Sequence, residues 1–430
     1  MPPARLSHGG DVLAVSGGGP LRGELRVPGD KSISHRALLL AALADGASSI
    51  SGLSDGADVA GTAAATAALG ASVESAGGVV VVRGGELRAP PGPINVGNSG
   101  TTIRLLAGIA AGCRFTTVLG GDASVNRRPM DRVAEPLRLM GADVDGSDGG
   151  RRAPLRITGG ALRGITYQPP VASAQVKGAV LLAGLFAAGE TVVREPVATR
   201  AHTEEMLAAF GADVCLGAGE VAVRASRPNP FEFAVPGDPS AAAFWMVGAA
   251  LVSGSAVTVR DVYSGQGRDG YLRVLRRMGA DLSVAPAGEG RVHLTCRSSP
   301  LRGTTITAAE VPELIDEIPV LAVAAAAADG PTRFEGAGEL RHKESDRMHS
   351  VLAGLEACGA SAEVDGDTLV VRGRSQLRGG RIDAAGDHRI AMAFCIAGLV
   401  AGTETVISGW RSVATSYPGF VSDLARCRGA

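Results

Sequence analysis

The chain has 430 residues, more than one hydrophobic core usually holds, so two domains of roughly 200 residues each are expected. Its 42 basic and 43 acidic residues give a net charge of −1, which excludes a general electrostatic attraction to nucleic acid or to an anionic membrane. The six cysteines form no CxxC pair, so neither a disulfide framework nor a zinc cluster is indicated. Any anion-binding site must therefore be a local concentration of cations.

The sequence also gives no sign of export or of membrane insertion. Residues 1–15 lack a charged head followed by an apolar core, the pattern of a secretion signal. The apolar runs 320–327 and 390–400 are shorter than the ~20 residues that span a bilayer, so they are interpreted as core helices. We expect a cytoplasmic protein with no membrane or nucleic-acid partner.

A long repeat runs through the chain. Six times, a short polar or charged motif precedes a helix-length run of small apolar residues that closes on a glycine. These glycines, spaced 65 to 77 residues apart, are Gly46, Gly112, Gly189, Gly254, Gly330 and Gly402. A period of this length predicts one supersecondary unit copied six times, whose buried helix begins with groups that can hold a ligand.

A second repeat falls between these glycines, where five helical stretches end in a glycine followed by alanine. The glycines are Gly70, Gly141, Gly211, Gly279 and Gly359. Glycine suits the left-handed position after a helix, and a strand is expected to follow. Each unit is therefore predicted to contain a buried helix, a strand, an amphipathic helix and a strand.

The two halves of the chain also repeat each other. The Val-Pro-Gly-Asp sequence at 27–30 returns 208 residues later at 235–238, at the same phase of the shorter repeat. This favours a duplication with three units in each half. The fold class is thus predicted as α/β, in two similar domains with buried central helices and sheets outside.

Cations collect in the polar motifs rather than on exposed helix faces. They stand in or beside turns rich in Gly, Ser or Asp, and they are Lys31, Arg36, Arg104, Arg128, Lys343, Arg347 and Arg389. Such a set predicts a ligand with several negative charges. The segment 97–102, Gly-Asn-Ser-Gly-Thr-Thr, is interpreted as a backbone cradle for an anion, although the same residues are also ordinary turn and N-cap chemistry.

Carboxylates accompany these cations. Asp316 and Glu317 come directly before an apolar helix, and Glu344 and Asp346 lie between basic residues. Acids at such positions either cap a helix or perform acid–base catalysis beside Lys and Arg. Asp346 is expected to be structural and to pair with a neighbouring arginine.

Seven motifs together resemble a known family. From about residue 20 to the C-terminus, in order, the chain is similar to 5-enolpyruvylshikimate-3-phosphate synthase, or 3-phosphoshikimate 1-carboxyvinyltransferase. The motifs occupy residues 27–36, 97–101, 128–130, 173–175, 314–317, 343–347 and 386–389.

The resemblance implies transfer of the enolpyruvyl group from phosphoenolpyruvate to the 5-hydroxyl of shikimate 3-phosphate, with release of phosphate, in a monomer without metal or organic cofactor. The implied fold is an inside-out α/β barrel of six βαβαββ units, three in each of two domains. Residues 1–29 with 236–430 would form one domain and 30–235 the other. The chain would cross between them at 27–30 and 235–238, and the active site would lie in an interdomain cleft that closes on the substrates.

The resemblance also implies residue roles. The positions similar to those that hold phosphoenolpyruvate are Lys31, Asn98, Gly100, Arg128, Gln175, Arg347 and Arg389. Those similar to positions around shikimate 3-phosphate are Lys31, Ser32, Arg36, Ser173, Ala174, Gln175, Arg200, Asp316 and Lys343. Asp316 and Glu344 match the acid–base pair, with Lys31 nearby.

One departure from the family pattern indicates a subgroup. Thr415 stands where many members carry a lysine that contacts phosphoenolpyruvate, and this variant resembles the subgroup called class II. The expectation for Arg200 at the shikimate phosphate comes from that subgroup.

Three alternatives stay open. One is the sister family, UDP-N-acetylglucosamine enolpyruvyl transferase, but its usual cysteine is absent from the loop 120–129 and its Lys-Asn opening is replaced by Lys31 and Ser32. The others are a non-catalytic paralogue and a paralogue that acts on another hydroxylated ring acid.

Overall fold

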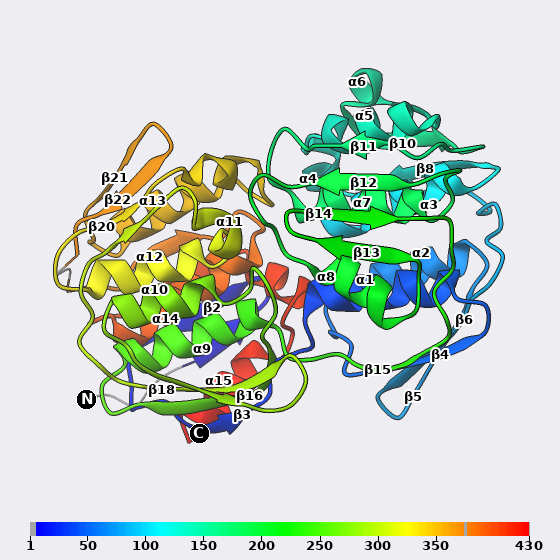
Figure 1. Ribbon diagram of the computed structural model, residues 1–430. Coiled ribbons are helices and arrows are strands. Elements are labelled where there is room, and N and C mark those ends of the chain that lie inside the picture. Colours follow the sequence, from blue (N-terminus) through cyan, green and yellow to red (C-terminus); the bar gives the residue numbers. More distant parts are fainter. Residues whose placement is uncertain (1–5, 374–375, 430) are drawn as a thin grey trace. The chain divides into compact units, whose positions relative to one another are not determined.

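The computed structural model describes residues 6–373 and 376–429 (Figure 1). Met1 to Arg5, the start of the predicted discontinuous domain, lie outside the described residues. The chain divides into two compact units at its two Val-Pro-Gly-Asp sequences. Met1–Pro28 and Pro236–Ala430 form what we call the discontinuous unit, and Gly29–Val235 forms the continuous unit.

Six four-stranded sheets share one strand order. In one of them, β7 (Ile94–Asn95) runs parallel to β8 (Thr116–Gly120), while β10 (Arg152–Thr158) is antiparallel to both β8 and β9 (Asp143–Gly146). The order β7-β8-β10-β9 recurs in every sheet. This sixfold pattern confirms the prediction of an α/β fold built from six units of one topology.

The remaining sheets complete the two units. The continuous unit adds β15 (Glu232–Ala234), β4 (Ala47–Ser51), β6 (Val79–Arg83) and β5 (Ser72–Ala76) in one sheet, and β11 (Thr166–Tyr167), β12 (Thr191–Arg194), β14 (Glu220–Val223) and β13 (Val214–Gly217) in another. The discontinuous unit contains β3 (Arg22–Leu25), β16 (Ala256–Tyr263), β18 (Arg291–Arg297) and β17 (Asp281–Pro286); β19 (Thr305–Ile306), β20 (Thr332–Phe334), β22 (Thr368–Val371) and β21 (Ala362–Asp365); and β23 (Arg381–Asp383), β24 (Thr405–Ser408), β2 (Val12–Val15) and β1 (Leu6–Gly9).

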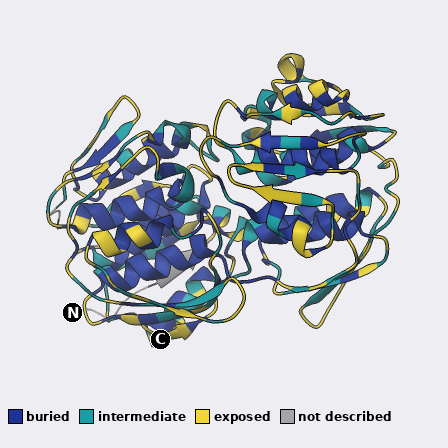
Figure 2. Ribbon diagram, viewed as in Figure 1, coloured by how far each residue is buried: buried dark blue, intermediate teal, exposed yellow. Residues whose placement is uncertain are grey.

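Three helices lie at the centre of each unit and are buried along nearly their whole length (Figure 2). They are α1 (Lys31–Leu43), α3 (Gly100–Gly112) and α7 (Ala174–Gly184) in the continuous unit, and α9 (Pro239–Leu251), α12 (Ile318–Ala327) and α14 (His388–Val400) in the discontinuous unit. Because these helices are apolar on every face, burial on all sides is their most stable environment. All six predicted helices are confirmed.

Five further helices cover the sheets and end at the predicted glycines. They are α2 (Ala57–Ala68), α5 (Asp131–Met140), α8 (His202–Ala209), α10 (Gly270–Arg277) and α13 (Arg347–Ala357). The glycine that follows each of them has a φ between 75° and 109°, which confirms the predicted left-handed helix ends.

Short helices and a C-terminal helix complete the structure. They are α4 (Ala123–Arg127), α6 (Ser147–Gly150), α11 (Val311–Leu314), α15 (Phe420–Cys427) and the 3₁₀ helices η1 (Ala337–His342) and η2 (Trp410–Thr415). Within the part of the chain that the structure describes, no helix combines the length and apolar content needed to cross a membrane. All six cysteines are free thiols in the structure.

Candidate functional site

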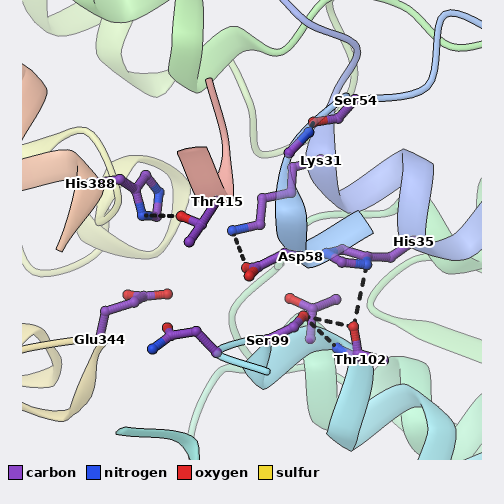
Figure 3. A network of polar contacts seen from close by, with 12 residues as sticks. Lys31, His35, Ser54, Asp58, Ser99, Thr102, Glu344, His388 and Thr415 are labelled. Atoms are coloured by element: carbon purple, nitrogen blue, oxygen red, sulfur yellow. Dashed lines mark hydrogen bonds and ion pairs between the residues drawn. The ribbon is translucent and has the colours of Figure 1, made fainter. Parts of the chain in front are cut away.

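Side-chain hydrogen bonds join the starts of the central helices in the continuous unit. Gln175, in the first turn of α7, donates from Nε2 to Thr101 Oγ1 of α3 at 2.9 Å. His35 of α1 hydrogen-bonds Thr62 of α2 at 2.6 Å, and Thr62 in turn contacts Thr102 of α3 at 2.6 Å. Thr102 Oγ1 also lies 3.4 Å from His35 Nδ1 (Figure 3). The three helix starts are thus held in fixed positions, and helix starts favour anions because their backbone N–H groups lack intrahelical partners.

Two cations with little exposed surface lie at these helix starts. Lys31, the first residue of α1, forms an ion pair with Asp58 at 2.5 Å (Figure 3). Arg128 donates to Asn98 Oδ1 at 3.0 Å, and its side chain is almost fully buried. A Cβ atom at Gly100 would lie 2.5 Å from Arg128 Nη1, so glycine at this position lets the guanidinium lie against the start of α3.

A second group of predicted residues lies between α1, α7 and α8. Arg36 is buried and donates from Nε to Thr203 Oγ1 at 2.7 Å and from Nη1 to the carbonyl of Ser32 at 3.0 Å. Ser173 caps α7, and Ala174 is its first residue. Arg200 lies in the segment that connects β12 to α8.

The helix starts of the discontinuous unit are joined in the same way. Ser240 of α9 donates a short hydrogen bond to Glu317, the residue before α12. Arg389 of α14 donates from Nη1 to the backbone carbonyl of Asp316 at 3.1 Å. Each unit therefore brings three of the six predicted helix-start motifs together.

Arg347 lies at the centre of a cluster of charged side chains in this unit. Its side chain is 1% exposed, and it contacts Asp316 at 3.0 Å, Asp387 at 2.7 Å and Glu344 in a shorter ion pair. Lys343 lies 3.5 Å from the same Asp316 oxygen. Burial alone would lower the pKa of Arg347, but the three carboxylates hold that pKa above its ordinary value. One permanent cation therefore orients both predicted acid–base carboxylates.

Thr415, in η2 of the same unit, hydrogen-bonds within η2 and to the start of α14. Its hydroxyl donates to the carbonyl of Ser412 at 2.7 Å and lies 3.3 Å from His388 Nδ1 (Figure 3). A threonine here carries no charge, so it cannot replace the cation of a lysine.

The prediction that Asp346 pairs with a neighbouring arginine is wrong. Asp346 is the N-cap of α13 and accepts from the backbone N–H of His349 at 3.0 Å; within residues 6–373 and 376–429 its side chain pairs with no arginine. The arginine that follows it, Arg347, instead points to three other carboxylates. Backbone N–H groups at a helix start compete effectively for a nearby carboxylate.

Several residues at these sites were not predicted. Asp58 pairs with Lys31, Thr203 binds Arg36, and Lys177 is fully buried with two glutamate partners. None of the three stands in a motif whose spacing indicates a partner, because each contact joins separate elements of the fold. Across the described ranges, no group of three or more His, Cys, Asp or Glu side chains is arranged to hold a metal ion.

Comparison with known proteins finds one family over nearly the whole chain. The EPSP synthase (3-phosphoshikimate 1-carboxyvinyltransferase) family matches residues 15–424. A 3-phosphoshikimate 1-carboxyvinyltransferase of Alkalilimnicola ehrlichii is 49% identical over 417 residues, which cover 95% of this chain and 93% of that protein.

Solved structures agree with this result. An EPSP synthase from Acinetobacter baumannii has a TM-score of 0.84 and 40% identity, with 96% of this chain and 97% of that chain covered. The enolpyruvyl transferase NikO from Streptomyces tendae has a TM-score of 0.79 but only 21% identity over 97% of each chain, so it supports the fold alone.

Proposed function

The chain belongs to the EPSP synthase family, and from this premise we propose that it transfers the enolpyruvyl group of phosphoenolpyruvate to the 5-hydroxyl of shikimate 3-phosphate. The products are 5-enolpyruvylshikimate 3-phosphate and phosphate. The protein would thus be a transferase of aromatic amino acid biosynthesis, on the path to chorismate, which acts on two small anionic substrates.

The observation that supports the proposed chemistry is that Asp316 and Glu344 both contact the buried guanidinium of Arg347. A protein that only bound anions would need the cations but not two acids held by one of them. Two positioned carboxyl groups are what an addition–elimination with two proton transfers requires.

The reaction assigns a task to each acid. In the addition, carbon 3 of phosphoenolpyruvate gains a proton while the 5-hydroxyl loses one and attacks carbon 2. In the elimination, the methyl group of the tetrahedral adduct loses a proton and phosphate leaves. We assign the hydroxyl proton to Asp316 and the methyl proton to Glu344, assisted by Lys31.

The remaining cations are assigned to substrate charges. For phosphoenolpyruvate the assigned residues are Lys31, Asn98, Gly100, Arg128, Gln175, Arg347 and Arg389. For shikimate 3-phosphate they are Lys31, Ser32, Arg36, Ser173, Ala174, Gln175, Arg200, Asp316 and Lys343. The buried Arg128 and Arg36 support these assignments, because a desolvated guanidinium binds an anion more strongly than an exposed one.

Both units carry assigned residues, so the proposal includes an approach of the units when substrates bind. A monomeric cytoplasmic enzyme without metal or organic cofactor is part of the same proposal.

Phosphate release by the purified protein tests the function. Phosphoenolpyruvate is supplied with shikimate 3-phosphate, or separately with UDP-N-acetylglucosamine, without added metal. Release only with shikimate 3-phosphate is expected. Release only with UDP-N-acetylglucosamine would favour the sister activity, and release with neither would favour a paralogue that is silent or acts on another ring acid.

A further inference from the structure

Lys177 is a buried lysine held by two carboxylates. It lies in the first turns of α7, and its side chain is 1% exposed. Its Nζ atom is 2.6 Å from Glu195 Oε2 and 2.5 Å from Glu204 Oε1. A buried ammonium is costly unless carboxylates compensate it, so this triad strongly restricts where the two glutamates can lie.

The two glutamates bracket one segment, residues 195–203. Glu195 directly follows β12, and Glu204 stands in the first turn of α8. Between them, the buried Thr199 donates a short hydrogen bond to the second oxygen of Glu195. Lys177 therefore holds both ends of the segment, and Thr199 fixes its middle.

This segment supports two arginines of the candidate site. Arg200 belongs to it, and Thr203 accepts the hydrogen bond from Arg36 at 2.7 Å. A Cβ atom at Gly178 would lie 2.8 Å from Thr203 Oγ1, so α7 also contacts the segment at the residue after Lys177. Residues 195–203 therefore connect α7 to both arginines: the segment contains Arg200 and the threonine that accepts the hydrogen bond from Arg36.

We propose that Lys177 is a positioning residue that sets the preference for a phosphorylated ring, because it holds residues 195–203 so that Arg200 and Arg36 can bind one phosphate group. Its own ammonium is buried and bound by two carboxylates, so it acts through these arginines and does not itself contact the substrate. The inference rests on the proposed function, since it takes shikimate 3-phosphate as the ligand.

Calorimetric binding of two ligands, without phosphoenolpyruvate, separates this role from a general structural one. Shikimate 3-phosphate and unphosphorylated shikimate are titrated into each variant, and the ratio of their affinities is the measured quantity. Lys177→Met is expected to lower this ratio by about tenfold, while its shikimate affinity stays within about threefold of wild type. Lys177→Arg keeps the cation and is expected to restore most of the preference.

Thr199→Val provides a second variant that leaves no charge unpaired. It removes the hydroxyl that fixes the middle of the segment and is expected to lower the ratio by about threefold. Thr191→Val is its matched control on β12, the strand that precedes the segment: Thr191 Oγ1 is buried and makes no hydrogen bond in the part of the chain that the structure describes. This control should keep the wild-type ratio.

The affinity ratios test the role of Lys177 separately from the proposed function. A wild-type preference that persists in Lys177→Met, or an equal loss of both ligands, overturns the inference and leaves the proposed function intact. If Lys177→Met does not fold, an unchanged ratio in Thr199→Val overturns the inference equally. A wild-type protein with no preference for shikimate 3-phosphate would contradict the proposed function itself, and the inference with it.

Discussion

Asp316 and Glu344 differ in position but share one partner. Asp316 precedes α12, Glu344 precedes α13, and Arg347 contacts both from a side chain that is 1% exposed. Because these carboxylates hold the pKa of Arg347 above its ordinary value, the guanidinium is charged at neutral pH. Arg347 therefore orients both carboxylates and keeps its own proton.

Neutralising either of these two carboxylates is expected to lower the turnover rate more than the stability of the fold. Asp316→Asn and Glu344→Gln should each lower kcat by roughly 100-fold or more, because each removes one positioned proton acceptor. Steady-state phosphate release measures the effect. Asp346→Asn is the matched control in the same segment, since asparagine caps a helix as well as aspartate does. Near-normal turnover in both acid variants would refute their assignment.

His35 is expected to make the free energy of unfolding depend on pH. Burial, followed by the charges of Lys31 and Arg36, holds the pKa of this imidazole well below 6.5. The unfolded chain therefore takes up a proton near pH 6.5 that the folded chain does not, so acid favours unfolding below that pH.

The variant His35→Gln isolates this contribution. Between pH 7.5 and pH 5.5, the wild-type free energy of unfolding should fall by about 1 kcal/mol more than that of the variant, since one titrating group contributes at most about 1.4 kcal/mol per pH unit. Urea unfolding at the two pH values measures the difference. Equal losses in the two proteins would show that His35 is protonated in the folded state.

At the scale of elements, close contact between the central helices depends on small residues. In α3, a Cβ atom at Gly108 would lie 2.2 Å from the carbonyl oxygen of Ala179 in α7. The obstacle is backbone, which cannot rotate away as a side chain can. Helices rich in alanine and glycine can therefore pack at this separation, whereas larger residues would force them apart.

Gly108→Ala is expected to lower the free energy of unfolding by about 1–3 kcal/mol, because the added methyl group separates α3 from α7. Gly61→Ala in α2 is the matched control, since its Cβ would meet nothing closer than 3.7 Å. Alanine in a helix is stabilising by about 0.5–1 kcal/mol relative to glycine, so the control should gain stability. If denaturant unfolding showed that both variants gain, or that both lose, free energy of unfolding, this account of helix packing would be contradicted.

At the scale of the molecule, the two units differ in how their sheets are completed. Every strand of the three sheets in the continuous unit comes from Gly29–Val235, because β15 returns to pair with β4. In the discontinuous unit, β2 and β3 come from the N-terminal segment and pair with β24 and β16. Residues 236–430 alone would therefore leave two strand edges unpaired.

Residues 29–235, expressed alone, are expected to fold cooperatively, whereas residues 236–430 alone should aggregate or remain partly unfolded because exposed strand edges recruit other chains. Circular dichroism and urea unfolding of the two fragments provide the comparison. The reverse result would mean that strand completion does not control folding here.

Substrate binding is expected to change the compactness of the whole protein. Cations and helix starts of both units are assigned to the same anions, and a bound polyanion would reduce the repulsion between them. The radius of gyration from small-angle scattering should fall when shikimate 3-phosphate is added, and unphosphorylated shikimate serves as the control. Identical scattering with and without shikimate 3-phosphate would contradict the proposed approach of the units.

The sequence by itself determined the repeating part of this protein. The six apolar helices, the helix-start motifs and the five left-handed glycines were all predictable, because each depends on residues within about one helix length of each other. The family resemblance added residue roles to motifs that were already visible.

Only the tertiary structure decided which side chains meet. Arg36 and Thr203 are 167 residues apart, Ser240 and Glu317 are 77 apart, and Lys177 joins two glutamates on different elements. Neither the helical period of 3.6 residues nor the strand period of two constrains such pairs. Ser240 and Glu317 meet because the central helices α9 and α12 pack side by side. The other contacts form because α8 and the segment before it pack against α1 and α7.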